Sequence, residues 1–245
     1  MENADLKSRL LALLREGNDI QQAFVAVLSA EERDAIGTPD RWSAKDLVAH
    51  LTSWKARRLL QLDAAIQGKE PPVFDMDETN SRAWDEQQRR SWDDILAEEA
   101  RVVPALADRI ERMSVSDLTA LGRYPLPLQP AAMLVARPGY THVVGHLAEH
   151  YIERGEMERA IALRQAAAAA LDAFPEFPEM ASAPHYNLAC SYALTSQPEQ
   201  ALTELRWALA LNPALMAHAR EDADLASLRE GAAFQALITG PEQRR

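Results

Sequence analysis

Histidines at regular spacing are the residues of this chain that could do chemistry as a group. His142, His146 and His150 follow one another at intervals of four residues. Because an α-helix turns by about 100° per residue, they would drift by about 40° per step and share one helix face. Neutral imidazole is a good ligand for divalent zinc, nickel or iron. Two such histidines can grip one ion, and a third from a neighbouring helix would leave coordination positions open to water or substrate.

His50 is the candidate for that third ligand. Leu47, Leu51 and Trp54 lie within one helical turn of it, so its ring is predicted to point into apolar surroundings. The competing interpretation is that these are ordinary surface or hydrogen-bonded core histidines that share a spacing by chance. Residue chemistry alone leaves both interpretations open.

The elements that position these residues are predicted to be helices throughout. Alanine, leucine, glutamate and arginine are good helix formers and dominate the chain, whereas only 9 of the 245 residues are glycine. Apolar residues recur at helical spacing from about residue 6 to 28, from 43 to 66 and from 77 to 113. A proline-rich loop at 121–130 and a fourth helix follow, with a break expected at Pro138-Gly139. Four long helices joined by a long crossover predict an all-α four-helix bundle.

Residues 156–245 are predicted to form a second helical region. Their helices are shorter, rich in alanine and separated by prolines. A helix–turn–helix with small residues at Ala189 and Ala201 and a closing Asn212-Pro213 resembles a tetratricopeptide repeat (TPR). One repeat is fewer than a free-standing solenoid needs, so the bundle or a second subunit is expected to cover it. The predicted domains are therefore 1–155, the bundle, and 156–245, the TPR-like tail.

Charge and composition exclude several classes of partner. The net charge of −11 disfavours nucleic acid as a partner, because an acidic surface repels phosphates. A single cysteine, Cys190, fits a reducing compartment. The polar N-terminus is unlike a signal peptide, and no apolar run reaches the length of a membrane span. We therefore expect a cytoplasmic protein that does not associate with membranes.

Two segments resemble motifs of the DinB-like superfamily of metal-binding four-helix bundles. Residues 42–54, around His50, are similar to its second-helix motif, and residues 142–150 are similar to its last-helix motif. The resemblance spans about residues 5–153 and implies that His50, His146 and His150 hold the metal. Gly145 stands where many members have a polar residue, and glycine loosens a helix. This leaves an alternative open, in which His142 joins His146 and His150 points outward.

Further residues resemble the ClbS/DfsB branch of that superfamily; they are Asn80, Trp84, Trp92 and the Tyr124-Pro125 loop. The resemblance implies a metal-dependent hydrolase or thiol-dependent transferase that acts on reactive small molecules, with a low-molecular-weight thiol as a possible partner. It also implies a homodimer. The alternative is a non-catalytic scaffold protein that binds a peptide or protein through its TPR-like tail, with the metal structural or absent.

Other residues near the histidines are candidates for supporting roles. Trp54, one turn after His50, is the first candidate for a pocket wall, and Trp42 and Trp84 are the others. Aromatic residues at helical spacing also occur in ordinary cores, and both interpretations stay open. Glu153 follows His150 by three residues and could orient a water or act as a base.

Overall fold

The computed structural model describes residues 2–38, 41–74, 84, 86, 88–120 and 130–239. In these ranges the chain is helical, and the one β-type pairing is an isolated bridge between Thr38 and Arg41. This confirms the predicted all-α fold. The chain divides into two compact units, Met1–Val143 and Val144–Arg245. The division falls inside a helix, so domains at 1–155 and 156–245 stay a prediction.

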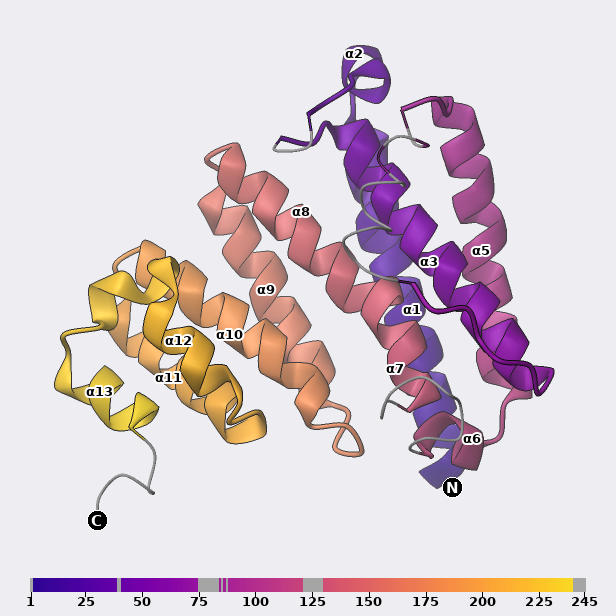
Figure 1. Cartoon of the computed structure of the whole chain (residues 1–245). Coiled ribbons are helices and arrows are strands. Elements are labelled where there is room, and N and C mark those ends of the chain that lie inside the picture. The colour runs from indigo at the N-terminus through magenta and orange to yellow at the C-terminus, as the bar shows by residue number, and fades with distance from the viewer. Residues whose placement is uncertain are drawn as a thin grey trace. The chain divides into compact units, whose positions relative to one another are not determined.

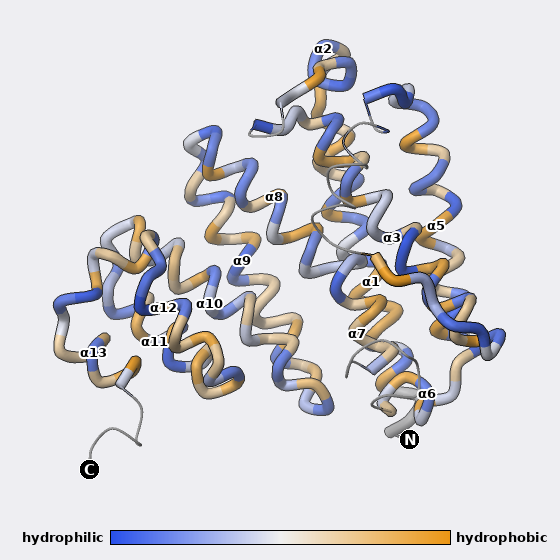
Figure 2. The backbone as a smooth tube through the Cα atoms, in the orientation of Figure 1, coloured by the Kyte–Doolittle hydropathy of each residue, from blue (hydrophilic) through white to orange (hydrophobic). Residues whose placement is uncertain are grey.

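The first unit is a helical bundle in which the long helices α1, α3 and α5 pack together with α7 and η1 (Figure 1). Helix α1 packs against α5, α7 and the π-helix η1, and α3 packs against α5 and against the same α7 and η1. Figure 2 shows apolar and polar residues alternating along these helices, as amphipathic packing requires. The elements are α1 (Glu2–Val27), α2 (Ala30–Asp34), α3 (Ala44–Ile66), α5 (Trp92–Arg112), α6 (Val115–Thr119), α7 (Ala131–Ala136), η1 (Arg137–Thr141) and α8 (His142–Glu153), which continues into the second unit.

A capping box fixes the start of α3 where the sequence predicts it. The Ser43 hydroxyl accepts a hydrogen bond from the Asp46 N–H at 3.1 Å, and the Asp46 carboxylate accepts one from the Ser43 N–H at 2.8 Å. Such a cap satisfies backbone donors that the first helical turn leaves without partners. The cap therefore fixes the first turn of the helix that carries His50. His50 is buried on α3, with 7% of its surface exposed.

The predicted third helix differs from the observed one. Gln88 to Ser91 are not helical, and α5 begins only at Trp92, where the Ser91 hydroxyl accepts a hydrogen bond from the Asp94 N–H. The Ser91 cap, rather than the longer apolar pattern, therefore marks where α5 begins. The predicted start at residues 77–78 and the loop at 121–129 lie outside the described residues.

The break expected at Pro138-Gly139 does not occur. Residues Arg137–Thr141 form a π-helix that joins α7 to α8 without interruption. A π-turn tolerates the loss of the backbone hydrogen bond that proline cannot donate. It also changes the rotation of the following helix about its axis. Gly139 also lies so close to α1 that a Cβ added at Gly17 would stand 1.9 Å from the Gly139 carbonyl oxygen. Gly17 therefore permits close helix packing, and α1 continues through it unbroken.

The second unit stacks shorter helices around α10. Helix α10 packs against α9, α11 and the 3₁₀-helix η2, and Ala189, Ala201 and Leu205 are fully buried between them. The predicted turn lies between α10 and α11, where Ser196 has a positive φ of 59°. The resemblance to a TPR stays a prediction. The elements are α9 (Met157–Asp172), α10 (Glu179–Leu194), α11 (Pro198–Leu211), α12 (Leu215–Glu221), η2 (Ala223–Leu228) and α13 (Ala232–Ile238).

His185 ties three helices of this unit together. Its Nδ1 lies 2.6 Å from Glu204 of α11 and its Nε2 lies 3.0 Å from Asp172 of α9. Burial alone lowers the pKa of His185, but the hydrogen bonds to these two carboxylates raise it above its usual value. His185 is therefore structural.

Within the described part of the chain, no helix is long and apolar enough to cross a membrane.

Candidate metal site

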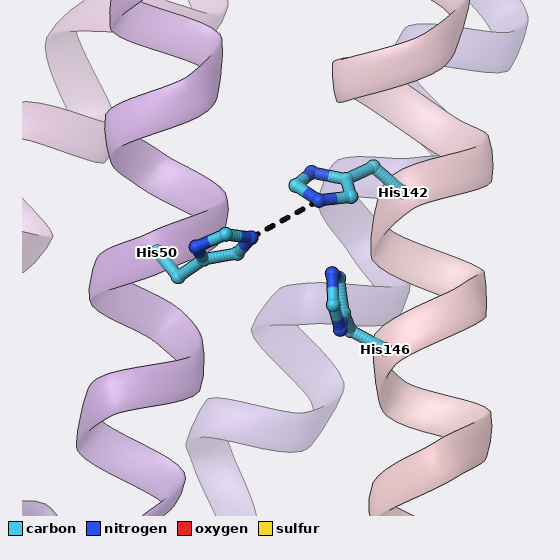
Figure 3. A group of neighbouring side chains, drawn as sticks. All are labelled: His50, His142 and His146. Carbon is cyan, nitrogen blue, oxygen red and sulfur yellow. Dashed lines mark hydrogen bonds between the residues drawn. The ribbon is translucent and has the colours of Figure 1, made fainter. Parts of the chain in front are cut away.

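Two imidazoles from different helices meet in the bundle. His50 comes from α3 and His142 is the first residue of α8, and their Nε2 atoms lie 3.1 Å apart (Figure 3). His146 follows His142 by one turn of the same continuous helix. One ligand nitrogen from each of the three rings lies within 4.8 Å of the others. The arrangement brings three imidazole donors to one place.

The donor set fits a divalent ion. Zinc–nitrogen bonds of about 2.0–2.1 Å would separate two ligand nitrogens by about 2.9 Å at right angles and about 3.3 Å in a tetrahedron. The observed separation of 3.1 Å between His50 and His142 falls between these values. His146 needs at most a small side-chain adjustment, because its ligand nitrogen already lies within 4.8 Å of the other two. Three histidines also leave at least one coordination position for water or substrate.

Glu149 contacts the His146 ring at its Nδ1 atom. Its carboxylate lies 3.3 Å from the Nδ1 of His146, one turn along α8. The hydrogen bond to His146 keeps the pKa of Glu149 below its usual value, although burial opposes this. A carboxylate on Nδ1 leaves Nε2 for an ion and orients the ring, as is usual around metal-binding histidines. Sequence reasoning missed this role, although the spacing of three residues is the signal for it.

The structure brings together some of the predicted ligands but not all of them. His50, His142 and His146 form the group, and His150 is not part of it. The ring of His150 lies 6.1 Å from that of Tyr151. The group therefore corresponds to the alternative set, with His142 in place of His150. Glu153 is exposed at the end of α8, about 10 Å farther along the helix axis than His146.

Tryptophans surround the two facing imidazoles. The ring of Trp42 lies 4.5 Å from that of His50, and the ring of Trp54 lies 6.4 Å from His50 and 6.3 Å from His142. Trp84 lies 6.3 Å from Trp42. Of the three tryptophans that the sequence suggested as pocket walls, Trp42 and Trp54 thus lie beside the histidines, and Trp84 lies next to Trp42. Of the residues that resemble the ClbS/DfsB branch, Asn80 and Tyr124-Pro125 lie outside the described residues.

Two arginines lie over the ring of Trp54. The guanidinium carbons of Arg57 and Arg58 stand 5.9 and 5.2 Å from the centre of its ring. Burial lowers the pKa of both arginines, and for Arg58 the charge of Arg137 lowers it further. Both remain charged near neutral pH, because guanidinium groups do not lose their proton in proteins. They place positive charge beside an apolar wall.

One of three comparisons with known proteins identifies a family for the bundle. No curated protein and no solved structure matches the chain. A protein-family comparison matches residues 12–153, more than half of the chain, to the DinB superfamily. The match covers the bundle, His50 and the whole of α8 with its histidines. The chain therefore belongs to the DinB superfamily.

Proposed function

We propose that this protein is a metal-dependent enzyme that acts on reactive, electrophilic small molecules. The observation that carries the proposal is the convergence of His50, His142 and His146 beside indole rings. Three histidines suit zinc, nickel or iron. When bound, such an ion supplies Lewis-acid chemistry that makes water or a thiol nucleophilic near neutral pH.

The chain's own residues bind and orient the substrate in this proposal. Trp42 and Trp54 offer apolar faces next to the histidines, so they would hold an apolar group and exclude water. Arg57 and Arg58 would attract an anionic group, such as the carboxylate of a low-molecular-weight thiol. Glu149 fixes the ring of His146. Each role uses a contact seen in the structure.

The two reaction types differ in their nucleophile. Hydrolysis of a reactive small molecule, as the resemblance to the ClbS/DfsB branch implies, uses water. A thiol S-transferase uses the sulfur of a small thiol instead. The arginines beside Trp54 favour a thiol that carries an anionic group, and Trp84 next to Trp42 supports the branch resemblance. A homodimer and a cytoplasmic location stay predictions.

The test is turnover by the metal-loaded full chain. Model electrophiles, such as an epoxide and 1-chloro-2,4-dinitrobenzene, are offered with and without glutathione or cysteine. We expect turnover that H50A and H142A each reduce at least about 100-fold, because both histidines would be ligands. The matched control is H218A, since His218 is an exposed histidine of the second unit.

The possible outcomes separate the reaction types. Turnover that needs the thiol indicates a transferase, and turnover without it indicates a hydrolase. Equal turnover by wild type, H50A and H142A would refute the proposal. Stoichiometric metal without turnover of any electrophile would favour the non-catalytic scaffold instead.

A further inference from the structure

A series of polar groups leads from His146 along the second unit. Its members all lie within Val144–Arg245; they are His146 and Glu149 of α8, Arg164 of α9, and Asn187 and Ser191 of α10. The first contact, between the Nδ1 of His146 and the Glu149 carboxylate, is 3.3 Å long. The groups that hold this carboxylate therefore decide how firmly the His146 ring is oriented.

Helices α8 and α9 form an antiparallel hairpin that brings Arg164 to the level of this contact (Figure 1). The turn between them contains Gly155, whose φ of 78° glycine adopts without strain. At a rise of 1.5 Å per residue, His146 and Arg164 both lie about 10 Å from the turn, and Glu149 lies about 6 Å from it. Long side chains on neighbouring helices can meet at this level, because packed helix axes are about 8–10 Å apart.

Helix α10 anchors Arg164. The Arg164 side chain is 6% exposed, and its Nη1 donates to the Asn187 carbonyl oxygen at 3.0 Å and to the Ser191 hydroxyl at 2.6 Å. Two hydrogen bonds from one nitrogen fix the position of the planar guanidinium. Arg164 is thus a buried positive charge that cannot swing away freely.

The charges of Arg164 and Glu149 act on each other. The two side chains line the same cavity. Burial lowers the pKa of Arg164, and the charge of Glu149 is the largest of those that oppose this effect. The hydrogen bond to His146 lowers the pKa of Glu149 most, and the charge of Arg164 adds to it. Because 58% of the Glu149 side chain is exposed, solvent screens the attraction, and we expect an effect of only a few-fold.

We infer that Arg164 is a positioning residue for the metal site: its charge holds the Glu149 carboxylate against the Nδ1 of His146, which leaves Nε2 of that ring available to an ion. The second unit would then contribute to metal affinity, although Arg164 lies beyond the family match, which ends at residue 153. This role rests on the proposed metal site and is the same for either of the proposed reactions.

A purely structural role for Arg164 is the competing explanation. In that case Arg164 only ties α9 to α10 through Asn187 and Ser191, and its loss would weaken metal binding whether or not Glu149 is charged. A direct effect of Arg164 on the ion would have the opposite sign, because a positive charge repels a cation. Only the positioning role makes the effect of Arg164 depend on the Glu149 carboxylate.

A double-mutant cycle on the affinity of the full chain for Zn²⁺ separates these explanations. The affinity is measured by competition with a chromophoric chelator at neutral pH, without any substrate. We expect E149Q to bind Zn²⁺ about 10-fold more weakly than wild type and R164Q about 3-fold more weakly. In the E149Q background, R164Q should cause no further weakening, because Arg164 then has no carboxylate to hold.

Further variants serve as controls. R164K keeps the positive charge, so it should recover most of the affinity that R164Q loses. R206Q removes the same charge from an exposed arginine of α11 and should change the affinity less than about 2-fold. If circular dichroism shows that R164Q does not fold, R164M, which keeps an apolar stem, replaces it in the cycle.

The outcomes distinguish this inference from the proposed function. R164Q that binds Zn²⁺ as wild type does, or that weakens binding equally with and without the Glu149 carboxylate, would overturn the positioning role alone. A wild-type chain that binds no Zn²⁺, or H142A that binds it as tightly as wild type, would overturn the metal site and this inference with it. The expected cycle in a chain that turns over no electrophile would support the positioning role and refute only the proposed reaction.

Discussion

A buried ion pair in the bundle gives the largest effect on stability that we expect from one side chain. The Nζ of Lys55 lies 2.5 Å from the Oε1 of Glu99 and 2.8 Å from the Oε1 of Gln21. Lys55 and Gln21 are 0% exposed and Glu99 is 1% exposed. Burial lowers the pKa of Lys55 more than Glu99 raises it. The pair therefore carries a large desolvation cost, which the close contact offsets only in part.

The size of the effect follows from what each substitution leaves behind. E99L or K55M alone strands one buried charge, which costs about 3–5 kcal/mol. That is a large share of the roughly 5–15 kcal/mol that stabilises a typical domain. The double variant removes both charges and also the Oε2 of Glu99, which has no hydrogen-bond partner in the described structure. Removing both charges can gain up to about 4 kcal/mol. The loss of Lys55 also leaves the buried Oε1 of Gln21 without its donor, which costs about 1–3 kcal/mol. The double variant should therefore lie close to wild type.

Urea unfolding followed by tryptophan fluorescence measures these changes. Trp54 precedes Lys55 directly and reports on the bundle. The expected pattern is two strongly destabilised single variants and a double variant near wild type, so that the coupling energy exceeds about 3 kcal/mol. Single variants that lose less than about 1 kcal/mol, or a double variant whose loss equals the sum of the singles, would refute this account of the pair.

Other substitutions test the packing, the cap and the titrating network. G17A should lose about 2 kcal/mol or more in urea unfolding, because its Cβ would collide with the Gly139 carbonyl oxygen, whereas G145A meets nothing within 4 Å and should gain up to about 1 kcal/mol; equal effects would refute the close approach. S43A should lose about 1 kcal/mol with its cap, and no loss would argue against the capping box. The pKa of His185 is raised in the folded protein, so protonated His185 stabilises the fold. This contribution is complete below the ordinary pKa of 6.5 and is lost as the pH rises through the raised pKa. The stability difference between wild type and H185Q should therefore be larger at pH 6 than at pH 9, and a difference that grows with pH would contradict the network.

Local signals in the sequence predicted much of the fold. The Ser43 cap and the apolar spacing place α3 correctly, and the composition alone indicates an all-α chain. The π-helix was not foreseen from the sequence, in which Gly139 gives no sign that it packs closely against Gly17 of α1 in three dimensions. An apolar pattern cannot report such a contact between distant segments.

The candidate site was predictable in kind but not in every member. The spacing of the histidines and the apolar neighbours of His50 indicate a site shared by two helices. The choice between His142 and His150 depends on the phase of α8, which the π-helix before it sets.

The central claim is that one divalent ion binds between His50 and the start of α8. Anomalous diffraction at the metal's absorption edge, from crystals of the metal-replete protein, tests it most directly. We expect a peak about 2.0–2.1 Å from one ring nitrogen each of His50, His142 and His146. A peak held by His146 and His150 without His142, or no peak near His50, would contradict the account.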